Sequence, residues 1–324
     1  MLFRSQIAPS FTYSSYRLHD SQFFFTELSD VAAGQLRNGS LLRQPYNDSF
    51  YVGALKVTAN LGAVELGSVS SYFHRSEDIW ADVTYVTGVV PVSYSDAVMS
   101  QFLCQQGIFM QELRLRSADP NARLGWDFGA FYSTTDVRTT QNSAGASLPG
   151  GSLTETDRSQ QTRLAGFGEV SVRLPKGLTL NAGLHSEHAS ATKTTESPPI
   201  LTAGGSDSVI LPQFRLSYQA AEHELLYFTA AKGYGTGGTW VVPIACPGET
   251  VARIGEDTLW SYEAGVKSGL LDGHLQLDTS LFHMQWNNNG PGYEQNCTTT
   301  YLGTPGSAAS NGFDVAVQIG RAHV

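Results

Sequence analysis

Apolar and polar side chains alternate along several short stretches of this chain, which is the periodicity of a β-strand with two different faces. In residues 111–117, Leu113 and Leu115 fall on one face, opposite three charged side chains. These charged residues are Glu112, Arg114 and Arg116. The same alternation returns in residues 164–174, 178–184 and 275–281. We expect antiparallel strands whose apolar face meets either lipid or a shared core.

Short and long connections alternate between these stretches. The short ones are residues 117–123, 175–177, 219–222 and 269–273. The long polar ones are residues 76–108, 135–161, 189–207, 234–257 and 287–309. Outer-membrane β-barrels have short periplasmic turns and long extracellular loops. The alternation therefore favours a transmembrane barrel over a soluble β-sandwich.

The pattern predicts about thirteen strands. The first four are expected at residues 7–17, 21–29, 48–60 and 63–75. Aromatic residues gather near the predicted strand ends, as they do where a barrel meets the membrane interface: Tyr72, Phe73, Phe131, Tyr132, Trp260, Tyr262 and Trp286. The predicted fold class is all-β, an antiparallel transmembrane β-barrel. Because plugged outer-membrane transporters have about 22 strands, these strands would form part of a larger barrel.

The composition of the chain argues against one class of binding partner and against one kind of membrane segment. The chain has 324 residues, 15% of them charged, and a net charge of −9. An acidic balance argues against binding to nucleic acid. No run of about 18 apolar residues occurs, so the sequence predicts no transmembrane helix.

Both ends of the chain resemble translated sequencing adapters. Residues 1–5 (MLFRS) and residues 319–324 (IGRAHV) can both be read from a common short-read adapter. We therefore expect residues 6–318 to be native, a partial barrel domain inside a longer protein. On this interpretation the lack of a signal peptide says nothing about export.

Two groups of residues could suggest catalytic or metal chemistry. The glycines in residues 233–238 lack the Gly-Lys-Ser/Thr of a phosphate-binding loop, so we interpret them as a strand that runs into a surface loop. His185 and His188 lie on either side of Glu187 without a HExxH helix, so we interpret them as solvent-exposed rim residues. We find no enzyme signature, and we expect no catalytic residues, cofactor or metal site.

The chain has three cysteines, two of which lie in consecutive long connections. Cys246 and Cys297 would both be extracellular, where oxidising conditions favour a disulfide bond. We expect a bond between them, with two free thiols as the alternative. Cys104, in an earlier long connection, would remain unpaired.

Residues 259–288 resemble the late-barrel signature of TonB-dependent outer-membrane receptors. In that family an aromatic-Tyr-Glu-x-Gly-x-Lys-Ser strand turns at Asp-Gly and returns as an alternating strand that ends in Phe-x-x-x-Trp. The matching residues are Trp260, Tyr262, Glu263, Gly265, Lys267, Ser268, Asp272, Gly273, Phe282 and Trp286.

Three further segments are similar to elements of the same family: residues 67–75, 111–117 and 230–238. The last one resembles the family's Ala-Lys-Gly-Phe-Arg-Pro-Gly-Gly element through Lys232, Gly233, Gly237 and Gly238. It departs from that element at Gly235-Thr236, where the family usually has Arg-Pro. A ligand contact by that arginine therefore does not carry over.

The resemblance implies a bacterial outer-membrane receptor that binds a scarce nutrient at its extracellular loops. Iron–siderophore complexes are the commonest class of ligand, and vitamin B12 and oligosaccharides are others. Energy would come from the TonB–ExbB–ExbD complex, which pulls on a plug domain that we do not find in this sequence. In the family, charged wall residues bond to the plug. The residues here that match such a role are Glu112, Arg114, Arg116, Glu169 and Arg173, although simple solvation of a wide lumen explains them equally well.

Two other classes of protein remain open. One is a passive porin-like or adhesin-like barrel without a plug. The other is a soluble all-β domain that binds or hydrolyses carbohydrate. In a soluble domain, the apolar strand faces must pack together in a shared core.

Overall fold

A computed structural model of the chain describes most of the sequence. The described residues are 4–21, 24–84, 97–119, 121–146, 148–197, 200–241, 251–254, 256–271, 274–289, 293–294, 301–302 and 306–319. Within these ranges no helix is long and apolar enough to cross a membrane.

Twelve strands form one antiparallel sheet in which spatial neighbours follow the order of the chain. They are β1 (Arg4–Leu18), β2 (Tyr46–Asn60), β3 (Val64–Asp82), β4 (Met99–Ser117), β5 (Leu124–Ala144), β6 (Ser152–Arg173), β7 (Leu178–Thr195), β8 (Leu201–Ala221), β9 (Glu224–Gly235), β12 (Asp257–Leu270), β13 (Leu275–Asn289) and β16 (Gly306–Ile319). Two small hairpins stand outside this sheet: β10 (Gly238–Val241) with β11 (Val251–Ile254), and β14 (Tyr293–Glu294) with β15 (Tyr301–Leu302).

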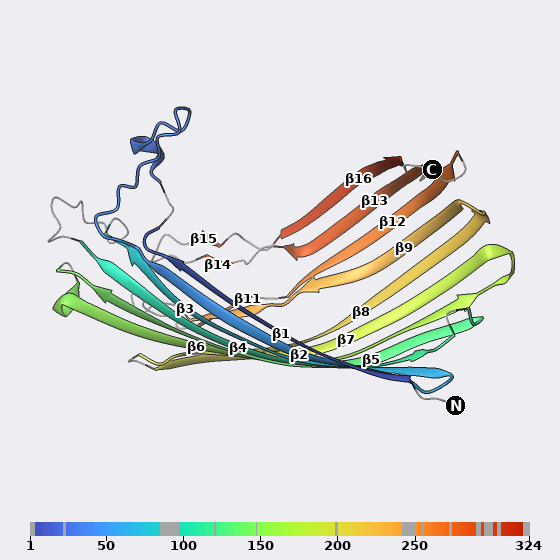
Figure 1. Cartoon of the computed structure of the whole chain (residues 1–324), viewed down its shortest axis with the longest axis horizontal. Coiled ribbons are helices and arrows are strands. Elements are labelled where there is room, and N and C mark those ends of the chain that lie inside the picture. The colour runs from blue at the N-terminus through green and yellow to red at the C-terminus, as the bar shows by residue number, and fades with distance from the viewer. Residues whose placement is uncertain are drawn as a thin grey trace.

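The sheet curves into a deep trough (Figure 1). Strand β1 begins and β16 ends at the end of the sheet where the short turns connect the strands, and the long hairpins extend to the other end. We call the inner side of the trough the concave face, and the space that it encloses the hollow. The predicted up-and-down β-barrel wall is confirmed by this topology.

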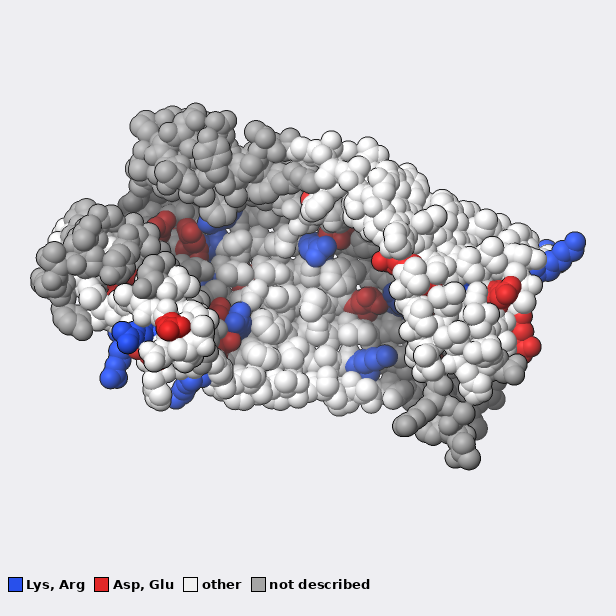
Figure 2. Space-filling model, turned by 90° about the horizontal axis from the view of Figure 1, so that it is seen from above, with Lys and Arg blue, Asp and Glu red and all other residues white. Residues whose placement is uncertain are grey.

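The two faces of the sheet differ in chemistry, because cross-strand partners share a face. On the convex face, Leu115 lies opposite Phe128, and Leu281 lies opposite Phe313. On the concave face, Figure 2 shows acidic and basic side chains gathered in the hollow. The convex apolar side chains remain uncovered, with Leu281 67% and Phe313 72% exposed. The core that a soluble domain needs is therefore missing from the described residues, whereas lipid would cover this face.

Aromatic side chains form a belt at one level of the convex face across β1 to β5. The rings of Phe11 and Tyr51 lie 6.3 Å apart, and those of Tyr51 and Tyr72 lie 6.2 Å apart. Phe109 and Tyr132 continue the belt at 6.5 Å. Aromatic belts mark the membrane–water interface of such barrels, so the strand segments beyond this level extend into water.

The strands extend further than the sequence predicts. Residues 135–161 are expected to be a connection, but β5 and β6 remain paired up to Ala144 and Ser152. The expected connections 76–108 and 189–207 are shortened in the same way by β3, β4, β7 and β8. The reason is that a strand in water is polar on both faces and loses the alternation that reveals it.

The strand predicted at residues 21–29 is wrong for the part of this segment that the structure describes. Thr26–Leu28 form a single 3-10 turn, and Asp30 makes only an isolated bridge with Gln35. The Phe25 backbone N–H donates to the Arg37 carbonyl at 2.9 Å, so the segment folds back on itself instead of joining the sheet. The sheet thus has twelve strands where the sequence predicts about thirteen.

Large aromatic side chains lie directly over glycines on neighbouring strands. Phe167 is paired with Gly129, and Tyr227 is paired with Gly265. A Cβ atom at Gly129 would lie 2.2 Å from Phe167 Cζ, and one at Gly265 would lie 2.6 Å from Tyr227 Cζ. Only glycine leaves room for these rings, which cover the backbone of the next strand.

Candidate functional site: the polar wall of the hollow

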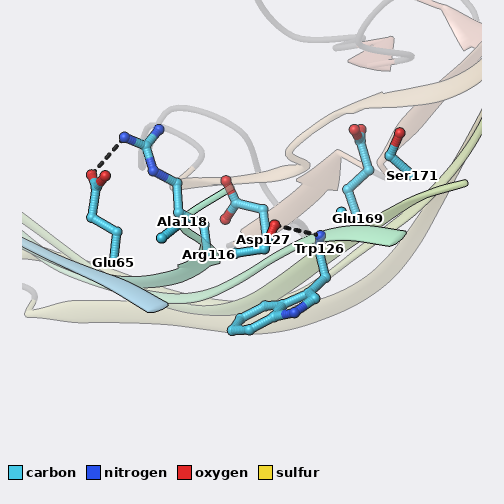
Figure 3. Close-up of a pocket in the computed structure, with 9 residues that line it drawn as sticks. Glu65, Arg116, Ala118, Trp126, Asp127, Glu169 and Ser171 are labelled. Carbon is cyan, nitrogen blue, oxygen red and sulfur yellow. Dashed lines mark hydrogen bonds and ion pairs between the residues drawn. The ribbon is translucent and has the colours of Figure 1, made fainter. Parts of the chain in front are cut away.

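A row of charged residues crosses four strands near the short turns. In the strand register, Glu65 lies opposite Arg116, Arg116 opposite Asp127, and Asp127 opposite Glu169. Arg116 Nη2 is 2.5 Å from Glu65 Oε1. Figure 3 shows these four side chains above the sheet, while the Trp126 ring points to its other side. The row lines a cavity of about 470 Å³ in the hollow.

Arg114 connects this row to the next level of the wall. Its Nε atom lies 3.5 Å from both Glu112 Oε1 and Asp127 Oδ1, and its guanidinium lies 5.1 Å from the centre of the Phe167 ring. Asp127 Oδ1 is buried and accepts no hydrogen bond from any described residue. A buried carboxylate oxygen without a donor is destabilising, so this oxygen can accept a hydrogen bond from a further group in the hollow.

The structure brings four of the five predicted wall residues together. Glu112, Arg114, Arg116 and Glu169 share the cavities of the concave face, and Glu169 accepts a hydrogen bond from Gln213 at 2.7 Å. Arg173 has a different contact. Its Nη1 donates to the carbonyl of Ala122 at 2.7 Å and so braces the turn between β4 and β5.

Two further residues of the charged row, Asp127 and Glu65, are not among the predicted wall residues, although each fits the alternation. Asp127 stands between two aromatic residues, Trp126 and Phe128, which is the signal that could have found it. The positions of Asp127 and Glu65 in the charged row depend on the register between strands, which alternation within one strand does not give.

Replacing Arg116 by methionine is expected to change the free energy of unfolding by less than about 1 kcal/mol, because exposed ion pairs contribute little. The Arg116 side chain is 52% exposed and its partner Glu65 is 28% exposed. Urea titration of the folded barrel in detergent measures the change. A larger loss would mean that the pair stabilises the wall itself.

A second cluster lies on the concave face farther from the short turns. The Glu187 side chain is only 4% exposed, and Arg163 Nε lies 2.7 Å from its Oε1 atom. His185 Nε2 lies 3.3 Å from Glu187 Oε2, and the Tyr234 hydroxyl donates to Oε1. His185, expected as a solvent-exposed rim residue, thus contacts this cluster while its side chain remains 35% exposed. His188 lies on the convex face, where Nδ1 lies 2.8 Å from Ser208 Oγ.

The aromatic residues of the family motif stack along the wall. The rings of Trp260 and Tyr262 lie 5.9 Å apart, and that of Tyr262 lies 6.2 Å from His283. Trp286 Nε1 donates to Asp257 Oδ2 at 2.9 Å. Phe282 covers Gly312 of the next strand.

The polar motif residues pair across β9, β12 and β13. Glu263 accepts a hydrogen bond from the Tyr227 hydroxyl, and Lys267 Nζ lies 3.5 Å from Asp278 Oδ2. Lys232 lines a cavity of about 760 Å³. Three glycines mark the end of the ladder: Gly233 pairs with Leu259 in the register, Gly237 follows β9, and Gly238 begins β10.

Some of the predicted residues lie outside the described ranges. These are Asp272 and Gly273 in the predicted Asp-Gly turn, and both members of the predicted disulfide, Cys246 and Cys297. Cys104 is described, and it is a free cysteine on β4.

Comparison with known proteins gives a family and a fold. Residues 3–320 match the family model described as TonB dependent receptor-like, beta-barrel. The ferric yersiniabactin uptake receptor FyuA from Yersinia pestis superposes with a TM-score of 0.76 at 15% identity, over 97% of this chain and 46% of that one.

Two further solved structures are similar. The ferric-catecholate import receptor Fiu from K12 E. coli gives a TM-score of 0.66 at 12% identity, over 97% of this chain and 53% of that one. The siderophore receptor PiuA from Acinetobacter baumannii gives 0.65 at 13% identity, over 97% and 51%. The chain thus spans about half the length of the receptors that it matches. On the evidence of the family model, the topology and the two-faced wall, this chain belongs to the TonB-dependent receptors, which are β-barrel proteins of the bacterial outer membrane.

Proposed function

We propose that the chain supplies part of the barrel wall of a receptor that takes up a scarce nutrient with energy from the TonB–ExbB–ExbD complex. The observation that carries this proposal is the charged concave face, opposed by an uncovered apolar convex face. A wall of this kind encloses an aqueous lumen in a lipid bilayer. Because the chain spans about half of each similar receptor, we infer that residues 6–318 lie within a longer barrel.

The charged row is suited to hold a plug domain inside the lumen. Glu112, Arg114, Arg116 and Glu169 present both signs of charge toward the hollow. Arg173 would contact the plug from its position beside the turn between β4 and β5. The buried Oδ1 atom of Asp127 supports this role, because a donor from a plug would satisfy it.

A ferric siderophore complex is the ligand that we favour. The similar receptors FyuA, Fiu and PiuA are named for ferric yersiniabactin, ferric catecholates and siderophores. At 12–15% identity they share only the fold with this chain, so this choice rests on the proposal of energised uptake. Vitamin B12 and oligosaccharides are the other classes.

Uptake of radioactive iron by the complete gene product tests this function. The gene is placed in a bacterial strain that lacks its own siderophore receptors, and ferric complexes of several siderophore classes are supplied. We expect uptake of at least one complex, and we expect deletion of the tonB gene to reduce it to background. Uptake that persists without TonB would instead indicate a passive porin-like barrel.

The same experiment includes a check on assembly. Heat-modifiable migration on gels shows that the barrel is folded in the outer membrane in both strains. A folded protein that imports no ferric complex, but imports vitamin B12 or an oligosaccharide in a TonB-dependent way, would keep the energised mechanism and replace the ligand.

A further inference from the structure

The sheet splits partway along β8, at the point where β9 stops pairing with it. Strand β7 remains paired with β8 as far as Leu201. Strand β9 pairs with β8 only from the turn up to the pair of Gln213 and Ala231. Pro212 stands at this point and has no backbone N–H to continue a ladder. Beyond it, within the described residues, β9 continues with β12 alone, up to Gly235.

The free end of β9 is held by a strand that is not its neighbour. The Tyr234 hydroxyl donates a hydrogen bond to Glu187 on β7, although β8 lies between β7 and β9 in the sheet. Arg163 on β6 donates to the same Glu187 oxygen. The bond from Tyr234 therefore closes across the concave face and not along the ladder.

The concave face beneath this end is covered. The most buried residues of β7 and β8 lie there, with Glu187 5%, Ala189 7%, Ala203 5% and Val209 6% exposed. On the convex side of the same stretch, Ile210 is 59% exposed. The backbone of β10 lies beside β7 and β8 without pairing with either of them. Residues 234–241 thus fold inward over the wall at the end of the trough that carries the long hairpins.

Glu187 can anchor this segment because it is a buried charge with several donors. A buried carboxylate is stable only when hydrogen bonds and an opposite charge compensate for its desolvation. Arg163 and His185 belong to the permanent wall on β6 and β7, and Tyr234 belongs to the segment that folds over it. Hydrogen bonds to charged groups are the stronger ones, so this single bond can determine how often the segment opens.

We propose that Tyr234, Glu187 and Arg163 form a latch that holds residues 234–241 against the concave face of β7 and β8. Breaking the bond between Tyr234 and Glu187 releases the segment and uncovers the extracellular half of the hollow. The latch belongs to the wall itself and operates whichever ligand the receptor takes up.

Cysteine accessibility tests the latch in the complete gene product on whole cells. Val209→Cys places a thiol of similar size beneath the segment, and a membrane-impermeant maleimide reports how often that position is exposed. The same protein without this substitution gives the background from the native cysteines. We expect slow labelling with the latch intact, and labelling about tenfold faster when Tyr234→Phe removes one hydrogen bond to a charged group.

Tyr227→Phe is the matched control. Tyr227 lies on the same strand and also donates to a carboxylate, but its partner Glu263 is on the neighbouring strand β12. Its loss should leave labelling at the rate of the latch-intact protein. Glu187→Gln is the second latch variant, and it should accelerate labelling as Tyr234→Phe does. Heat-modifiable migration confirms that each variant is folded.

Two results would overturn the latch. One is labelling at the unchanged rate in whichever of Tyr234→Phe and Glu187→Gln is folded. The other is equal acceleration by Tyr227→Phe, which would show general loosening of β9. Neither result depends on ligand uptake. The experiment therefore tests the latch independently of the proposed transport function.

Discussion

Replacing Leu281 by arginine is expected to destabilise the barrel by about 2–4 kcal/mol, the cost of a lipid-facing arginine near the bilayer midplane. Leu281 lies on the convex face, opposite Ala264 and Phe313, and is 67% exposed. It stands six residues beyond the start of β13 at Leu275. At about 3.3 Å per residue and a tilt of about 40°, this is roughly 15 Å above the turn, near the middle of an apolar band about 25 Å tall.

Ser280→Arg provides the matched control at the same depth. Ser280 precedes Leu281, lies on the concave face and faces Asp314 across the strands. An arginine there would meet water and a carboxylate, so its effect should stay within about 0.5 kcal/mol, as for ordinary surface substitutions. Urea titration in lipid vesicles, followed by heat-modifiable migration, measures both variants. Equal losses at the two positions would contradict the assignment of the convex face to lipid.

Gly129→Ala is expected to cost about 1–3 kcal/mol, as overpacking does in a well-packed interior. The new Cβ atom would lie 2.2 Å from Phe167 Cζ and 2.8 Å from the backbone oxygen of Leu113. The ring cannot move away freely, because the Arg114 guanidinium lies over it and the His185 ring stacks 6.3 Å away. The same urea titration measures the loss.

Two variants test this explanation. Gly166→Ala adds the same methyl group on β6 next to Phe167, where nothing lies within 4 Å, so it should be neutral or slightly stabilising. Combining Gly129→Ala with Phe167→Ala should cost less than the sum of the two single changes, because the clash disappears with the ring. An additive double variant would show that the ring is not what Gly129 accommodates.

The fold could be predicted from the sequence wherever one face of a strand meets lipid. Leu113 and Leu115 reveal β4, and the charged residues that alternate with them fall on the concave face as expected. Beyond the aromatic belt both faces of a strand meet water, so Thr139 and Thr140 on β5 carry no alternation. The sequence therefore predicts connections for the parts of these strands that extend into water.

The site could be predicted only in part, for a related reason. Alternation within one strand assigns Glu112 to a face, but the contact between Arg114 and Asp127 also needs the register between two strands. The bond between Tyr234 and Glu187 needs more, because it depends on where β9 separates from β8. Pro212 is the only local sign of that point, and a single proline does not reveal which distant residue will meet the released strand.

The long hairpin of β5 and β6 has a consequence for the resistance of the protein to proteases outside the cell. Its backbone groups are paired up to Ala144 and Ser152, and β4 and β7 pair with its outer edges for much of that length. A protease must bind its substrate as an unpaired, flexible segment, and such segments are concentrated at loop tips. In this hairpin the strand pairing stops only at the short connection after Ala144 and before Ser152. This hairpin can therefore rise above the lipid and still present little unpaired backbone to digestive enzymes outside the cell.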